Sequence, residues 1–154
     1  MDKDRVLAFN ERNIAEFRRR GGELGGPFEG APVLLLTTTG AKSGQPRTSP
    51  MMYLPDGDRL IVFASNEGKD THPAWYHNLR AHASATVEVG TETYPVDATE
   101  ITGDEHDRLY DIQAERYPGF AAYRERTDRV IPVIALTRAD ATSGAAEAPA
   151  SPTA

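Results

Sequence analysis

The apolar residues of this chain gather in six short segments that are rich in β-branched and aliphatic side chains and are bounded by turn residues. Such segments are typical of β-strands. The six predicted strands are residues 33–39, 47–54, 59–65, 83–89, 93–99 and 130–137. Short turn segments at 55–58 and 90–92 separate two neighbouring pairs, so we expect antiparallel hairpins there. The pattern favours a meander or a closed barrel over a parallel sheet.

Four further segments have helical patterns. In the first, residues 5–20, the apolar side chains fall within about half of a helical wheel. These side chains are Val6, Leu7, Phe9, Ile14 and Phe17. A short helix is predicted over 73–80, where proline stands near the first turn. A capping box at 102–105 predicts a helix as far as about Tyr117, and a further helical turn or two covers 119–126.

The length of the chain, 154 residues, suits a single domain with its own core. Residues 1–20 are predicted to form a helix packed on that domain, and the loop at 21–32 is rich in Gly and Pro. Residues 21–138 are expected to form the domain itself. Residues 139–154 have no large apolar side chain, so they cannot bury enough surface to offset the entropy of ordering. We predict a disordered tail.

The composition excludes several classes of chemistry. The chain has no cysteine, which excludes thiolate nucleophiles, cysteine-ligated zinc, iron–sulfur clusters and disulfides. Its 17 Lys and Arg residues against 23 Asp and Glu residues leave a net charge of -6. This balance argues against a nucleic-acid binder, which needs a broad basic face. Any anion site must therefore be local.

The sequence predicts a cytoplasmic protein. Its longest apolar run, Val33 to Leu36, is far below the roughly 20 residues of a membrane span, and the N-terminus lacks the apolar core of a signal peptide. The basic residues Arg18, Arg19 and Arg20 end the first helix. Contact of that helix with the inner face of the plasma membrane therefore stays open as the minority alternative to packing on the domain.

The connection between the first two predicted strands, residues 37–47, reads TTTGAKSGQPR. It places two glycines, the Ser43 hydroxyl and the cations Lys42 and Arg47 in a tight turn that can present N–H groups to a phosphate. A Walker P-loop is not predicted, because its motif is absent and Pro46 with strand-like residues replaces the helix that the motif requires. From this loop alone, an anion site and a solvated hairpin turn both stay open.

The histidines do not match a metal motif. His72, His77 and His82 recur every five residues, a step of about 500° on a helix, so they do not share a face. The sequence also lacks the G-x-S-x-G and H-E-x-x-H motifs of hydrolases. We therefore predict neither a metal site nor a hydrolase.

Two groups of aromatic residues are candidates for a pocket. Trp75 and Tyr76 lie in the predicted short helix, where large rings commonly serve the core. Tyr117, Phe120 and Tyr123 are spaced by three, which on helical turns places the rings on one side. A Pro-Gly pair interrupts this second segment, so a kinked aromatic wall and ordinary core packing both stay open.

Taken together, these segments resemble the deazaflavin-dependent nitroreductase family of actinobacteria, also described as F420-dependent quinone reductases. TTGAKSGQPRTSPMMYLPDGDRLIVFASN is similar to that family's cofactor loop and following hairpin. HPAWYHNLRAHASATVEVG is similar to its central helix and strand, and Tyr117-x-x-Phe120-x-x-Tyr123 to its aromatic substrate wall. The resemblance spans roughly residues 5–138. It implies a mainly β fold of the α+β class, a six-stranded antiparallel split β-barrel with an N-terminal helix and peripheral helices.

The resemblance also implies a site for coenzyme F420, a phosphate-bearing deazaflavin. Cations and exposed N–H groups of the glycine-bearing loop would hold its phosphate and acidic tail. These residues are Lys42, Ser43, Gly44 and Arg47. The deazaflavin ring would lie near Pro50, Met51, Met52, Ala64, Ser65, Asn66 and Trp75. The substrate would be held by Trp75, Phe120 and Tyr123.

The implied activity is transfer of hydride from reduced F420 to a small electron-poor acceptor, which is a quinone, an enone or a nitro-aromatic. Ser65, Tyr117, Tyr123 or solvent would protonate the product. Family members with strong nitroimidazole-reducing activity carry tyrosine where this chain has Phe120 and a base where it has Asn66. An FMN-binding reductase of the same barrel class and a non-enzymatic F420 carrier stay open as alternatives, and so does a homodimer.

Overall fold

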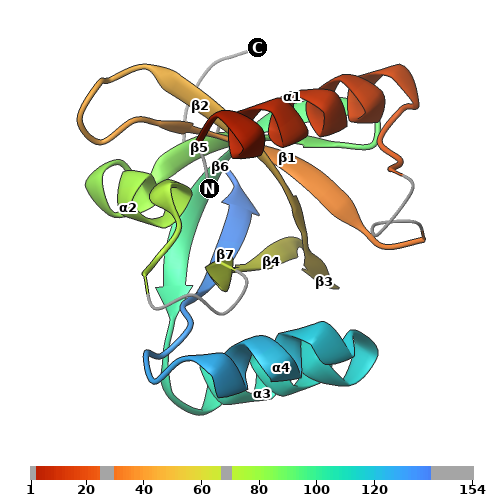
Figure 1. Cartoon of the computed structure of the whole chain (residues 1–154). Helices are drawn as coiled ribbons and strands as arrows, with labels where there is room; N and C mark the ends of the chain where they lie inside the picture. Colours follow the sequence, from red (N-terminus) through yellow and green to blue (C-terminus); the bar gives the residue numbers. More distant parts are fainter. Residues whose placement is uncertain (1–2, 25–29, 67–70, 140–154) are drawn as a thin grey trace.

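The computed structural model describes residues 3–24, 30–66 and 71–139. Within these ranges the chain forms a seven-stranded sheet and four helices (Figure 1). The elements are α1 (Lys3–Arg19), β1 (Val33–Thr39), β2 (Pro46–Met52), β3 (Leu54–Asp56), β4 (Arg59–Phe63), α2 (Ala74–Ala81), β5 (Ser84–Val89), β6 (Glu92–Ile101), α3 (Gly103–Arg116), α4 (Pro118–Arg126) and β7 (Val133–Arg138). The predicted tail, apart from Ala139, lies outside the described residues.

The sheet is antiparallel throughout, as the sequence predicts. Its strand order is β2-β1-β5-β6-β7-β4-β3, and all six neighbouring pairs are antiparallel. The two edge strands, β2 and β3, follow each other directly in the chain. The sheet therefore curls into a half-barrel, with α1 on one side and the α3–α4 pair at the opposite end (Figure 1).

The predicted number of strands is wrong, because the segment 47–54 forms parts of two strands rather than one. β2 pairs with β1 as far as Met52, opposite Val33, whereas β3 pairs with β4. Between the two strands, Tyr53 donates its N–H to the carbonyl of Pro32, 3.1 Å away. The chain crosses from one edge of the sheet to the other at Tyr53, and a continuous run of strand-forming residues does not reveal such a change of partner.

Both predicted hairpins are present. β3 and β4 pair across a turn that contains Gly57, and β5 and β6 pair across a turn that contains Gly90. The φ angles of these glycines are 63° and 60°. Glycine adopts this left-handed conformation without the steric cost that other residues meet. Local turn chemistry therefore sets the register of both hairpins.

Strand β1 lies at the centre of the core because both of its faces are covered. Leu34 and Leu36 are fully buried in a cluster shared with α2, whereas Val33 and Leu35 pack with Phe17 of α1. Successive side chains of a strand point to opposite faces, so alternate residues of this apolar run fill two different clusters. A third cluster joins α3 and α4 to β4 and β7.

Helix α1 packs on the sheet, and its last turn is bonded to β5. Phe17 is 1% exposed, and Arg18 donates two hydrogen bonds to Glu88, at 2.9 and 2.7 Å. The predicted apolar contacts of Val6, Leu7 and Phe9 lie outside the described side chains. Among the helices in the described ranges, none is long and apolar enough to cross a bilayer.

Helix α3 has the predicted start but not the predicted capping box. Thr102 is the N-cap, yet its side chain makes no cap hydrogen bond. Glu105 instead accepts a hydrogen bond from Arg59 of β4, at 2.9 Å. A hydrogen bond between two charged groups is stronger than one to a neutral backbone N–H, which explains the preference. The predicted bounds hold, since α3 ends at Arg116 and α4 begins at Pro118.

Candidate functional site

The loop between β1 and β2 has a closed shape that its own backbone maintains. Gly40 donates to the carbonyl of Gln45 at 2.8 Å and accepts from the N–H of Gly44 at 2.9 Å. The Ser43 hydroxyl oxygen accepts from the N–H of Gln45 at 3.1 Å. Gly44 has a φ of 72°. The predicted phosphate loop is therefore preformed, which lowers the entropy that binding an anion would cost.

Asn78 of α2 anchors this loop and the end of β1 through two hydrogen bonds. The sequence analysis did not identify this residue. Its side-chain oxygen accepts from the N–H of Ala41 at 2.9 Å, and its side-chain nitrogen donates to the Thr38 hydroxyl at 3.0 Å. The residue is 7% exposed. Asparagine is a poor helix former, so its place in the middle of a short apolar helix was an available signal.

The two predicted cations are exposed, Lys42 on this loop and Arg47 at the start of β2. Neither has an ion-pair partner among the side chains that the structure describes, which are those of residues 11–24, 30–66 and 71–139. The guanidinium of Arg47 makes one long contact, 3.5 Å, to the carbonyl of Pro46. Both positive charges are therefore available to an anionic ligand, and Ser43 and Gly44 lie between them in the sequence.

Strand β2 continues from the loop along an edge of the sheet. It carries Pro50, Met51 and Met52, all half-buried, and pairs with β1 on one side. Met51 packs against the cluster shared with α2, and Met52 packs against the clusters of α1 and of α3–α4. An edge strand with thioether side chains offers a flat and adaptable apolar surface.

The end of β4 carries the second group of predicted ring contacts. Ala64 is fully buried, and its N–H donates to the carbonyl of Pro132 at 2.9 Å. Ser65 is half-buried. Asn66 has a φ of 48°, in the left-handed region, and its side-chain nitrogen donates to the carbonyl of Thr71 at 2.9 Å. Asparagine tolerates this conformation better than most residues, so it suits the sharp turn here.

Trp75 belongs to the same apolar cluster as Met51 and Ala64. Tyr76 beside it is buried and donates to Glu100 of β6 at 2.7 Å. Burial, reinforced by this hydrogen bond and by the Glu100 charge, raises the pKa of Tyr76. The structure thus brings three of the predicted ring contacts together from β2, the end of β4 and α2.

The aromatic triplet packs elsewhere, in the cluster beneath α3 and α4. Phe120 is 9% exposed, and its ring lies 5.7 Å from Phe63 and 5.4 Å from Tyr123. Tyr117 and Tyr123 are half-buried. Met52 contacts this cluster too, whereas Trp75 packs on the other one. The structure does not bring Trp75 into one cluster with Phe120 and Tyr123.

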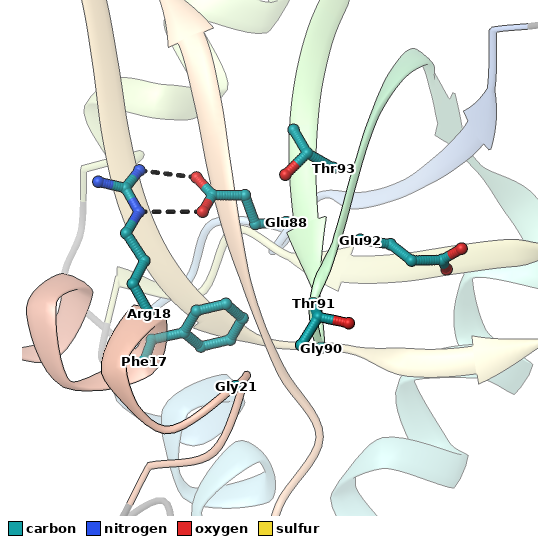
Figure 2. A pocket seen from close by; sticks show the side chains of 8 residues that line it. All are labelled: Phe17, Arg18, Gly21, Glu88, Gly90, Thr91, Glu92 and Thr93. Atoms are coloured by element: carbon teal, nitrogen blue, oxygen red, sulfur yellow. Dashed lines mark hydrogen bonds and ion pairs between the residues drawn. The ribbon is translucent and has the colours of Figure 1, made fainter.

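Surface cavities of the described residues include two that differ in size and place. The larger, about 230 Å³, lies between the end of α1 and the β5–β6 hairpin, beside the Arg18–Glu88 ion pair (Figure 2). The smaller, about 150 Å³, lies between α2 and the strands β6 and β7, where Tyr76, Arg80 and Glu100 line it. No predicted site residue lines either cavity.

Arg129 and His72 were also missed by the sequence analysis. Arg129 lies between α4 and β7, and its guanidinium contacts the backbone of Ala64 and Ser65 and the ring of His72. Its contacts join residues up to 65 positions apart in the chain. Such a long separation leaves no signal in spacing or periodicity, and an isolated arginine in a connection between a helix and a strand is not informative by itself.

Comparisons with known proteins identify the family of the chain. A family model described as F420H(2)-dependent quinone reductase matches residues 10–138. An F420H(2)-dependent quinone reductase of Mycobacterium tuberculosis strain H37Rv is 41% identical over 128 residues, which is 80% of this chain and 86% of the relative.

Two solved structures are similar in both fold and sequence. One, described as an F420-H2 dependent reductase, has a TM-score of 0.63 and 38% identity, and the match covers 68% of this chain and 93% of that one. The other, described as a domain-swapped dimer, has a TM-score of 0.65 and 35% identity, with 86% and 97% covered. The extent and identity of these matches lead to one conclusion: the chain belongs to the F420H(2)-dependent quinone reductase family.

Proposed function

We propose that the chain binds coenzyme F420 and transfers hydride from its reduced form to a small electron-poor acceptor, with quinones as the first class to test. The observation that carries the proposal is the preformed loop of residues 40–45, with the cation Lys42 within it and Arg47 just after it. Neither cation has an ion-pair partner among the described side chains. The loop leads directly into the open edge strand β2. An anionic tail followed by a flat ring fits these two surfaces in that order.

The phosphate and acidic tail of the cofactor would lie on the loop. Lys42 and Arg47 would supply charge-assisted hydrogen bonds, and the guanidinium can hold two oxygens of one phosphate or carboxylate. The N–H groups around Ser43 and Gly44 would complete the site. Asn78 supports this role because it keeps the loop in one shape before the ligand arrives.

The deazaflavin ring would lie over β2 and the end of β4. The ring contacts that we propose are Pro50, Met51, Met52, Ala64, Ser65, Asn66 and Trp75. When bound, the cofactor supplies a hydride in a two-electron step, so the protein has to bind, orient and exclude water rather than provide a redox group. Met51 and Trp75 would supply the dry apolar contact, and the polar side chain of Ser65 would face the ring or the acceptor.

The acceptor would be held between Trp75 and the aromatic triplet. Because Phe120 is 9% exposed, it would act chiefly by backing Tyr123, whose ring lies 5.4 Å away. Ser65, Tyr117, Tyr123 or solvent would protonate the reduced product. A quinone, an enone and a nitro-aromatic share the electron-poor centre that hydride transfer requires, and the family that the chain belongs to favours the quinone.

Fluorescence titration of the purified protein with F420, with FMN as the control ligand, tests the proposal. The bound, reduced complex is then mixed with menadione. We expect F420 to bind more tightly than FMN and menadione to reoxidise the complex faster than it reoxidises free reduced F420. Tighter FMN binding would instead favour an FMN reductase. F420 binding without reoxidation by any quinone, enone or nitro compound would favour a carrier.

The relative that forms a domain-swapped dimer supports a further proposal, that this chain forms homodimers. Light scattering during size-exclusion chromatography would measure the mass directly, and a monomer across the micromolar range would contradict the homodimer.

The peripheral membrane contact of α1 stays a prediction, which flotation with anionic lipid vesicles would test.

A further inference from the structure

Arg129 joins three segments that are far apart in the chain. Its guanidinium donates to the carbonyl of Ala64 at 3.1 Å, to the carbonyl of Ser65 at 2.8 Å and to Nδ1 of His72 at 3.0 Å. Its own backbone N–H is held by the Thr127 hydroxyl at 3.2 Å. The side chain thus connects the end of β4, the residues before α2 and the α4–β7 connection.

These contacts begin where the β4–β7 ladder ends. The last paired residues are Phe63 and Val133, and one further hydrogen bond joins the N–H of Ala64 to the carbonyl of Pro132. Beyond that point the carbonyls of Ala64 and Ser65 have the guanidinium as partner. A backbone carbonyl away from water needs such a partner, so the arginine extends the ordered part of the strand by two residues.

The segment 64–66 is held from its other end as well. Asn66 adopts a left-handed backbone conformation and bonds through its side chain to Thr71. With Arg129 on one side and Thr71 on the other, the backbone at Ser65 is fixed in both position and direction. Sites that orient a reactive ring require tolerances of about 0.5 Å, which a strand end without supporting contacts does not provide.

His72 keeps the arginine in place only while its ring is neutral. An arginine side chain can only donate hydrogen bonds, so Nδ1 of His72 must act as the acceptor. Among the residues that the structure describes, the charged and titratable groups around this ring are His77 and Arg80 of α2, Glu100 of β6, and Arg129 itself, and the ring of Tyr76 lies 4.7 Å away. Protonation of His72 would place two positive charges in contact.

We propose that Arg129 is a positioning residue for hydride transfer, which holds the backbone of Ala64 and Ser65 so that Ser65 and Asn66 present a fixed surface to the deazaflavin ring, with neutral His72 as its support. The proposal rests on the proposed function, because the placement of the ring beside this segment is part of it. Arg129 acts through the segment that it orders and does not touch the reacting atoms.

Kinetics of the full-length protein separate positioning from binding. In Arg129→Gln, we expect kcat for menadione reduction to fall by about 10- to 100-fold, because small misplacements of reacting groups cost rates of this size. The Kd for F420 should change by less than about threefold, since in the proposed complex the phosphate loop with Lys42 and Arg47 would supply most of the binding energy. Arg129→Lys keeps a cation for the carbonyls and should recover part of kcat.

Arg138→Gln is the matched control. Its guanidinium lies over the ring of Tyr94, 3.8 Å from the centroid, and has no contact with the segment 64–66. If Arg129→Gln does not fold, as judged by its thermal unfolding, Arg129→Lys is compared with Arg138→Lys instead. A kcat in the Arg129 variant equal to that of its Arg138 control would overturn the positioning role and leave the proposed function intact.

A second readout needs no cofactor. Proton–nitrogen correlation spectra of the histidine side chains, recorded from pH 5 to 8, give the pKa of His72 in the apo protein. Arg129→Gln should raise this pKa, because it removes a neighbouring positive charge. His72→Asn keeps an acceptor near the place of Nδ1 but cannot titrate, so it should flatten the acid limb of the kcat profile.

The outcomes distinguish failure of the positioning role of Arg129 from failure of the proposed function. An unchanged His72 pKa in Arg129→Gln would overturn the contact itself. A raised pKa together with an unchanged kcat would show a structural contact only, which overturns the positioning role. Absence of F420 binding by the wild-type protein would overturn the proposed function, and the positioning role with it.

Discussion

The candidate phosphate loop requires glycine at positions 40 and 44 for two different physical reasons. At Gly40 a Cβ atom would lie 2.5 Å from the Ser43 hydroxyl oxygen and 3.2 Å from the carbonyl of Gln45, so there is no room for a side chain. At Gly44 there is room, but the φ of 72° disfavours other residues. Both requirements are local.

The first prediction at this scale concerns the two cations. Replacing Lys42 and Arg47 together by Ala should weaken F420 binding by about a hundredfold or more, because two charge-assisted contacts to the phosphate and tail are lost. Fluorescence titration measures the Kd. The double variant Arg108→Ala, Arg116→Ala removes the same charge from the exposed face of α3 and is the control. An unchanged Kd would show that the phosphate site lies elsewhere.

A second prediction concerns the proton donor. If a side chain protonates the product, the triple variant Ser65→Ala, Tyr117→Phe, Tyr123→Phe should lose about 100-fold or more in kcat, the usual contribution of a general acid. Stopped-flow oxidation of the reduced complex by menadione measures this rate. Near-normal turnover in the triple variant would reject all three side chains and leave solvent as the donor.

At the scale of elements, α2 connects parts of the candidate site that come from distant segments. Through Asn78 it holds the β1–β2 loop, and through Tyr76 it bonds to Glu100 of β6. His72, just before the helix, contacts Arg129. The helix has eight residues, too few to be stable alone in water, so these contacts and its apolar side hold it in place.

The prediction at this scale is that Asn78→Ala weakens both the fold and the site. Loss of one buried and one half-buried hydrogen bond should lower the free energy of unfolding by about 1 to 3 kcal/mol, since the Thr38 hydroxyl and the N–H of Ala41 lose their partner. Urea denaturation measures this change, and F420 titration should show weaker binding. His77→Ala, on the exposed side of the same helix, is the control. Equal stability of the two variants would contradict the anchoring role.

At the scale of the whole molecule, the curl of the sheet determines which surfaces meet. β2 and β3 are opposite edges in the strand order yet consecutive in the chain, so Tyr53 links the two edges of the half-barrel. The apolar cluster under α2 then joins Met51 of β2 to Ala64 at the end of β4. A flat open sheet would hold these two predicted ring contacts at opposite sides of the molecule.

The stability of the whole fold should depend on pH through His72. Burial, followed by the charges of Arg129 and His77, lowers its pKa below the ordinary 6.5. The unfolded chain therefore binds a proton at higher pH than the folded one, and the free energy of unfolding should increase as the pH rises towards about 6.5. Denaturation of His72→Asn should show a shallower increase than the wild type, whereas His82→Asn, on an exposed residue, should match the wild type. Equal slopes in all three proteins would contradict the shifted pKa.

The features that the sequence by itself determined depend on residues that are close together in the chain. Gly57 and Gly90 set two hairpins because their turns need left-handed backbone, and the β-branched and aliphatic run that begins at Val33 predicts a strand. The glycine-bearing loop with Lys42 and Arg47, taken together with the segment 72–90 and the aromatic triplet, likewise indicated the family before any contact was known. Each of these signals depends on residues a few positions apart.

Only the tertiary structure decided which residues that are distant in the chain form hydrogen bonds and ion pairs with each other. The change of partner at Tyr53 depends on which strand lies beside it, and the replacement of the capping box depends on Arg59, 46 residues before Glu105. The same holds for Asn78 beneath the loop, 37 residues away, and for Arg129 beside Ala64, 65 residues away. Hydrogen bonds and ion pairs act over about 3 Å in space, whatever the separation in sequence, so only the folded chain reveals them.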